Sequence, residues 1–165
     1  MKNISDPLYI IRVLLLVFMI GLILSGLSAI PLQWEIGILE PLLGSGSRFN
    51  QFFPAISLWI DKVSQGVMKG YTQYPFLAYG TDWLAFGHVA IALAFIGPLR
   101  DPVRNLWVVE FGMIACLLVI LWTLAFGPIR GIPFFWMLID MSIGVFGIIP
   151  LWFARRSILK LSLEP

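Results

Sequence analysis

The chain has 165 residues, of which 59% are hydrophobic and only 12% are charged, with a formal net charge of +2. A soluble globular domain is about 45–50% apolar and about 25% charged, so this composition indicates an integral membrane protein. The small charge, without a basic run interleaved with exposed aromatic residues, excludes nucleic-acid binding. The single Cys116 lies in an apolar run, which excludes an internal disulfide and predicts a buried, inert thiol.

Four apolar segments reach or approach the length of about 20 residues that a membrane-spanning helix needs. In chain order they cover residues 8–30, 76–97, 106–126 and 134–153. Lys2, Arg12 and the stretch Leu27-Ser28-Ala29 give the first segment some features of a signal peptide with its cleavage site. Its apolar run exceeds the roughly 7–15 residues of a signal-peptide core, so we predict that this helix is retained.

Residues 31–75 separate the first and second spans and contain an amphipathic pattern. Apolar residues recur there at helical spacing after Pro54, which suits a helix start; they are Phe52, Ile56, Trp59, Ile60, Val63 and Val67. The pattern predicts a helix over about residues 53–69 that lies on the outer membrane surface or over the bundle. Its role is either interfacial packing or that of a lid over an outward-facing pocket. The preceding "LLGSGSRFN" is predicted to be a flexible linker.

The distribution of lysine and arginine predicts the orientation of the spans. If the spans alternate in direction, one side carries Lys2, Arg12, Arg100, Arg104, Arg155, Arg156 and Lys160, and the other carries Arg48, Lys62, Lys69 and Arg130. The positive-inside rule then places both termini in the cytoplasm and the 31–75 loop outside. The predicted fold is an all-α integral membrane protein, a single helical-bundle domain over residues 1–165 with four transmembrane helices and an extracytoplasmic amphipathic helix between the first and second.

Ionisable residues inside the predicted spans are the candidates for function, because a charge at membrane depth needs a partner, water or neutralisation. At 1.5 Å per residue, Arg12 and Glu110 each lie roughly 6 Å inside the cytoplasmic boundary, on the first and third spans. They are predicted to form a buried ion pair. His88 and Asp140 lie roughly 9–10 Å inside the outer boundary, on the second and fourth spans, and are predicted to meet across the bundle.

Small residues on the second and fourth spans support the predicted contact between His88 and Asp140, because they let helices approach closely. Asp140 shares a face with Gly144 and Gly147, while the second span offers Gly87, Ala90 and Ala94. Gly80-Thr81-Asp82 is typical of a helix start, in which Thr81 or Asp82 caps free backbone N–H groups. Alternatively, Asp82 takes part in an outer polar pocket.

Two interpretations of His88, the only histidine, remain open. It either donates a hydrogen bond to Asp140 or to a backbone carbonyl and fastens two helices, or it lines an outward pocket with Asp140, Asp82 and Arg130 that binds a ligand or moves a proton. Haem and zinc are disfavoured, because bis-histidine haem needs a second histidine and zinc needs further ligands. No metal or cofactor is predicted.

The segment "YPFLAYGTDWLAFGHVAIALAFIGPLRDPVRNLWVVEFGMIAC", with the later "GPIRGIPFFWMLID", resembles a group of small, uncharacterised bacterial inner-membrane proteins over residues 74 to about 150. The resemblance implies location in the bacterial inner membrane and carries over no catalytic residue. No P-loop, GxSxG, HExxH or CxxC motif is present.

Two classes of function follow from these observations, with a transporter as a weaker third, since four helices give few surfaces for alternating access unless the protein dimerises. The first is a non-catalytic membrane module that binds a lipid-like ligand or a partner subunit, with membrane lipids and a second copy of the chain as further partners. The second is a membrane enzyme acting on a lipid-like substrate, with His88 and an acidic residue as its acid/base pair. We favour the first, because acid/base catalysis needs a cavity that admits substrate and the small residues on these helices indicate close packing.

Overall fold

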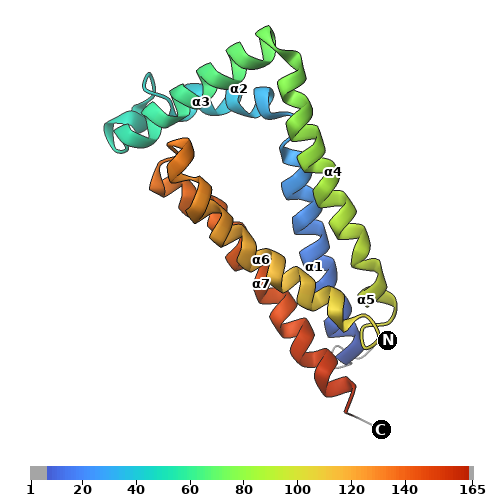
Figure 1. Cartoon of the computed structure of the whole chain (residues 1–165). Coiled ribbons are helices and arrows are strands. Elements are labelled where there is room, and N and C mark those ends of the chain that lie inside the picture. The colour runs from blue at the N-terminus through green and yellow to red at the C-terminus, as the bar shows by residue number, and fades with distance from the viewer. Residues whose placement is uncertain (1–6, 164–165) are drawn as a thin grey trace. The chain divides into compact units, whose positions relative to one another are not determined.

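The computed structural model describes residues 7–163, and every regular element in that range is helical (Figure 1). The described residues form two compact units. One contains the chain up to Leu22 and from Ala90 onward, and the other is Ile23–Val89. The predicted single domain is not tested by this division, since α1 and α4 each run through the boundary between the units.

Four helical segments are long and apolar enough to cross a membrane, as predicted. The first is α1 (Pro7–Ser28), the third is α6 (Leu106–Phe126) and the fourth is α7 (Phe134–Leu161). The third matches its predicted bounds. The fourth continues eight residues beyond the predicted 153, because Arg155, Lys160 and their neighbours are good helix formers even though the apolar run has ended.

The second segment, Pro75–Arg100, is a composite of three helical pieces. A short 3-10 turn, η2 (Pro75–Leu77), leads into α4 (Ala78–Ala94), and α5 (Ile96–Arg100) follows after Phe95. Pro98 explains the interruption, because it has no N–H to donate to the carbonyl four residues earlier, at Ala94. The predicted span of residues 76–97 is therefore helical but not one continuous helix.

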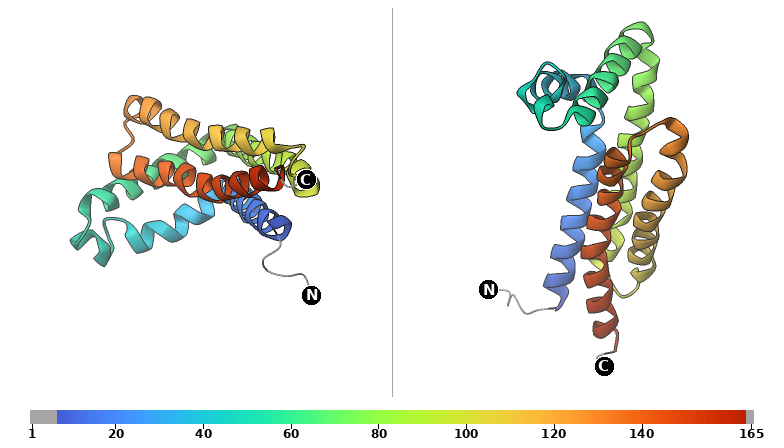
Figure 2. Two further views of the ribbon diagram at one scale, coloured as in Figure 1. Left: turned by 90° about the horizontal axis from the view of Figure 1, so that it is seen from below. Right: turned by 90° about the vertical axis from the view of Figure 1, so that its left-hand side faces the viewer.

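The unit made of the chain up to Leu22 and from Ala90 onward is built around the antiparallel pair α6 and α7. These helices lie side by side through most of their length, as both figures show (Figure 2). The turn between them ends at Gly131, whose positive φ of 67° suits glycine. The buried apolar core of this unit combines residues of α6 and α7 with residues of α1 and Phe95 of the α4–α5 junction. Its members are Ile11, Leu15, Phe18, Phe95, Val108, Val109, Cys116, Leu151, Ala154 and Ile158. The buried state predicted for Cys116 is confirmed.

Close backbone approach joins α6 to α7. A side chain added at Gly144 would collide with the backbone carbonyl of Cys116, and one added at Gly147 would lie 3.0 Å from the Cys116 sulfur. The small face of α7 therefore packs on α6. The sequence assigned this face to the second span, and that assignment is wrong, because a small-residue stripe signals close packing without identifying the partner.

The unit Ile23–Val89 contains a helical hairpin, of which the sequence predicted one of the two helices. Its two arms are α2 (Leu32–Leu43) and α3 (Pro54–Gln73), which pack against each other and are joined by a loop with the short turn η1 (Arg48–Gln51). The helix α3 confirms the amphipathic helix predicted over residues 53–69. The helix α2 falls in the region predicted as a loop, because Gly37 and Pro41 weaken the helical signal of a segment only 12 residues long.

Candidate functional site

Glu110 forms an ion pair with Arg155, not with Arg12. The Arg155 guanidinium approaches Glu110 Oε1 through Nη2 at 2.8 Å and donates from Nε to the same oxygen at 2.9 Å. The predicted Arg12–Glu110 pair is therefore corrected. Arg155 lies beyond the predicted fourth span, but α7 continues as a helix through this residue and places it beside α6.

Arg12 has a different, structural partner. Its Nε donates to the backbone carbonyl of Leu99 in α5 at 3.1 Å, and the side chain is half-buried. Helix ends leave carbonyl groups without intrahelical donors, and α5 ends one residue later at Arg100. The Arg12 guanidinium therefore satisfies a helix end and links α1 to α5.

His88 lies in α4 at a close crossing with the C-terminal part of α1. A side chain added at Gly26 would collide with the His88 Cβ and would lie 3.3 Å from the carbonyl oxygen of Ala85. The imidazole Nδ1 is 2.8 Å from the backbone carbonyl of Leu84, one turn earlier on the same helix. A carbonyl only accepts, so Nδ1 is the donor of this bond, and in the neutral tautomer Nε2 is then the acceptor.

The predicted meeting of His88 with Asp140 is not decided by the structure, because the two residues belong to different units. Asp140 is half-buried on α7, and within its own unit no described side chain or backbone group forms a hydrogen bond or salt bridge with it. His88 is likewise half-buried, with its one described bond made inside α4. The pair stays a prediction.

The other two candidate residues are exposed. Asp82 does not join His88, whereas Arg130 belongs to the other unit, so its predicted place beside His88 is not decided. Asp82 is six residues before His88 on α4, which corresponds to about 9 Å along the axis and a different face. The capping prediction is wrong, because α4 begins at Ala78 and Thr81 donates its hydroxyl to the Ala78 carbonyl at 2.7 Å. Arg130 is exposed in η3 (Pro128–Arg130), at the turn between α6 and α7.

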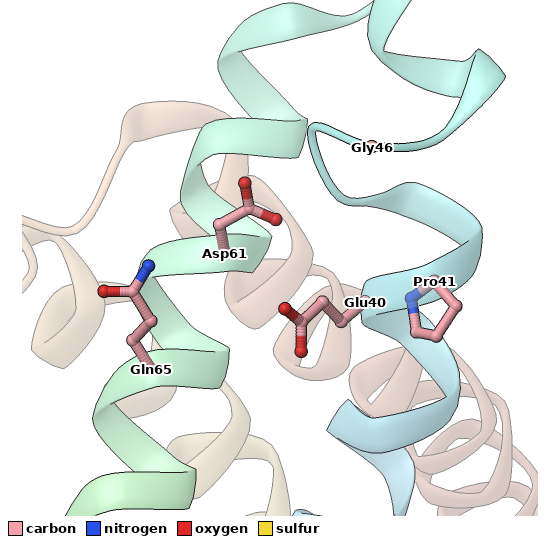
Figure 3. Close-up of a pocket in the computed structure, with 5 residues that line it drawn as sticks. All are labelled: Glu40, Pro41, Gly46, Asp61 and Gln65. Carbon is pink, nitrogen blue, oxygen red and sulfur yellow. The ribbon is translucent and has the colours of Figure 1, made fainter.

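A polar cavity that the sequence did not predict opens between α2 and α3 of the hairpin (Figure 3). Its volume is about 390 Å³, and it is lined by Glu40, Pro41, Gly46, Asp61 and Gln65. The carboxylates of Glu40 and Asp61 extend from facing helices into the space between them. The signal for this site was weak, since the two acids are 21 residues apart and only the hairpin brings them together.

Both carboxylates are held by serine residues. Asp61 accepts the backbone N–H of Ser45 at 3.1 Å and the hydroxyl of the same serine. Glu40 accepts the hydroxyl of the buried Ser64 on α3. The loop is fastened further by Asn50, whose side-chain amide donates to the Ser45 carbonyl at 3.1 Å. These bonds fasten residues 44–50 to α3, within the stretch 42–50 that was predicted as a flexible linker.

The chemistry available at this cavity is acceptance of hydrogen bonds by carboxylate oxygens. Part of each carboxylate's capacity is used by serine, and both residues line the cavity. In the part of the chain that the structure describes, no group of three His, Cys, Asp or Glu side chains is arranged to hold a metal ion.

The fold and these sites define a class: an all-α protein with four helices of membrane-spanning length and a helical hairpin between the first two. Comparison with known proteins found no matching family model, no similar curated protein and no similar solved structure.

Proposed function

We propose that this chain is a multi-pass protein of the bacterial inner membrane that works as a non-catalytic module, binding a lipid-like ligand or a partner subunit. The observation that carries the proposal is that ionisable groups in the long apolar helices are bonded to other groups of the protein. Glu110 is neutralised by Arg155, and His88 bonds to its own helix. Half-buried groups engaged in this way stabilise a scaffold, whereas an acid/base pair needs groups aimed at a space that admits substrate.

The hairpin is the element that presents a binding surface. Exposed apolar side chains lie at every fourth position along α2, with Trp34 69% exposed, Ile38 43% and Leu42 61%. Leu58 is exposed in the first part of α3, but from Lys62 onward the exposed side chains are polar: Lys62, Gln65, Lys69, Thr72 and Gln73. An apolar face on a helix tethered directly after a membrane span suits contact with the lipid interface. We therefore assign the interfacial role, expected of the second arm, to α2.

The competing function is an enzyme acting on a lipid-like substrate with His88 and an acidic residue as its acid/base pair. One observation favours it: Nε2 of His88 makes no hydrogen bond to the described residues of its own unit, and this acceptor is the atom a general base would use. Asp140 is the acid nearest in predicted depth.

Replacing His88 by glutamine separates the two functions. Glutamine still donates a hydrogen bond but does not exchange a proton near neutral pH. We expect His88→Gln to insert normally and to retain full complementation of a deletion strain, together with the lipid that co-purifies with the chain by mass spectrometry. Asp140→Asn should behave alike. Normal folding with complete loss of complementation in both variants would overturn the non-catalytic role and favour the enzyme.

Cysteine labelling tests the topology of this proposal. In a Cys116→Ala background we expect a membrane-impermeant maleimide to label Gln73→Cys, at the end of α3, in intact cells. Leu163→Cys, beyond α7, should be labelled only after the membrane is opened, because the basic residues at that end hold it in the cytoplasm. The reverse pattern would invert the orientation and contradict the prediction.

The same background tests the interfacial role of α2. Ile38→Cys should resist the maleimide until detergent is added, since its side chain would lie in lipid, while Gln65→Cys on the polar face of α3 should react at once. Equal rapid labelling of both positions would mean that α2 faces water and would remove it as the interfacial arm.

A further inference from the structure

Basic side chains gather at one end of the unit that contains α6 and α7. The start of α1, the α5–α6 turn and the end of α7 meet there, because Ile11, Val108 and Ile158 share one core. The same segments carry Arg12, Arg100, Arg104, Arg155, Arg156 and Lys160. Within residues 7–163 the acidic residues on these segments are Asp101 and Glu110.

Both acids are already engaged in the fold. Glu110 is paired with Arg155, and Asp101 accepts the backbone N–H of Arg104 at 3.0 Å in the turn after α5. Arg100, Arg104, Arg156 and Lys160 are exposed, and no described carboxylate forms a salt bridge with them. This end of the unit therefore carries an excess of positive charge that the described chain does not neutralise.

Helix α7 places two of these cations on the same face as an exposed tryptophan. Trp152, Arg156 and Lys160 follow one another at intervals of four residues, so they share a face turned away from the buried Leu151, Ala154 and Ile158. The Arg156 guanidinium lies over the Trp152 ring, 5.5 Å from its centroid. This contact fixes the cation beside an indole, the side chain that marks the edge of a membrane's hydrocarbon region.

The spacing along α7 matches the depth of lipid headgroups. If the hydrocarbon ends near Trp152, then Arg156 lies about 6 Å and Lys160 about 12 Å farther out. The headgroup region of one leaflet is roughly 5–8 Å thick, so Arg156 lies at phosphate level. Lys160 lies beyond that layer, and its long side chain leans toward the helix N-terminus, back toward the phosphates. Arginine and lysine at that depth attract anionic lipids.

We propose that the face formed by Trp152, Arg156 and Lys160 binds the headgroup phosphate of an anionic phospholipid. This inference rests on the proposed function in taking the chain to be a membrane protein with a lipid-like ligand, and it names the chemistry of that ligand. The indole lies against the glycerol and upper acyl chain, and the two cations contact the phosphate. Arg100 and Arg104 add to the attractive field at the same end.

The test is native mass spectrometry of the full-length chain, titrated in detergent with phosphatidylglycerol or with phosphatidylcholine of the same acyl chains. Wild type should bind phosphatidylglycerol more tightly. Because a cation near the surface contributes about a fivefold gain, Arg156→Gln with Lys160→Gln should reduce the preference about 25-fold. Both side chains are exposed, so the variant should fold.

A matched control removes the same charge elsewhere. Lys62 and Lys69 are exposed on α3, and Lys62 also lies over an indole, 5.4 Å from the centroid of Trp59. Lys62→Gln with Lys69→Gln should keep the wild-type preference. Equal binding of both lipids by wild type, an equal loss in the control, or displacement of the lipid by millimolar inorganic phosphate would overturn the assignment.

Failure of this inference and failure of the proposed function give different results. A chain that floats with phosphatidylcholine vesicles but shows no preference for phosphatidylglycerol overturns the headgroup site and leaves the membrane module standing. A chain that floats with no vesicle overturns both.

Discussion

Gly144→Ala should lower the free energy of unfolding by about 1–3 kcal/mol, the range for overpacking a close contact. The added methyl group would meet the backbone carbonyl of Cys116 on α6. Backbone in the middle of a helix cannot move aside as the end of a flexible side chain can, so α6 and α7 must separate. Thermal or denaturant unfolding of the purified chain in detergent measures the change.

Gly21→Ala is the matched control for this substitution. Gly21 also lies inside a long apolar helix, but nothing is within 4 Å of the position its Cβ would take. Alanine is the better helix former by about 0.5–1 kcal/mol, so this variant should be slightly more stable than wild type. If Gly144→Ala were stabilising to the same extent, the close approach of α6 and α7 would be wrong.

A double-mutant cycle at Glu110 and Arg155 should give the second large effect. Each single alanine variant leaves a half-buried charge without its partner, and the side chains are 35% and 40% exposed for Arg155 and Glu110. A pair at this level of exposure, reinforced by a charged hydrogen bond, should show a coupling of about 1–2 kcal/mol, between the values for surface and buried pairs. The double variant should therefore be more stable than the sum of the singles predicts.

A second cycle, with Arg12 in place of Arg155, distinguishes the observed Arg155–Glu110 pair from the Arg12–Glu110 pair predicted from the sequence. Arg12 bonds to the Leu99 carbonyl, so Arg12→Ala and Glu110→Ala should add to within about 0.3–0.5 kcal/mol, as independent sites do. Strong coupling of Arg12 with Glu110, and none of Arg155 with Glu110, would restore the sequence-based pair.

The wrong ion pair predicted for Glu110 shows that equal depth along two helices does not identify which charged residues meet. Arg12 and Glu110 do lie at comparable distances from their helix starts, which is all that counting residues measures. Arg155 lies beyond the predicted fourth span, which ends at residue 153, yet α7 continues to Leu161. A helix extends past its apolar run when its next residues favour helix, and that extension changes which charges meet.

The hairpin shows a similar limit. The pattern of α3 was strong enough to predict, because its apolar and polar residues alternate at helical spacing over many turns. The segment of α2 is short and contains Pro41, so its helix depends on packing against α3. The cavity with Glu40 and Asp61 depends on that same pairing and could not be found from either helix alone.

The sequence by itself determined that this protein is all-α, where its four long apolar helices lie, and that an amphipathic helix separates the first two. These properties are local, since length, apolarity and periodicity within one segment decide them. Only the tertiary structure decided that Gly144 faces α6, that Glu110 pairs with Arg155, that His88 lies against Gly26 and that α2 joins α3 in a hairpin. Each of those depends on the rotation of one helix about its axis relative to another, which the spacing of residues along a single helix does not specify.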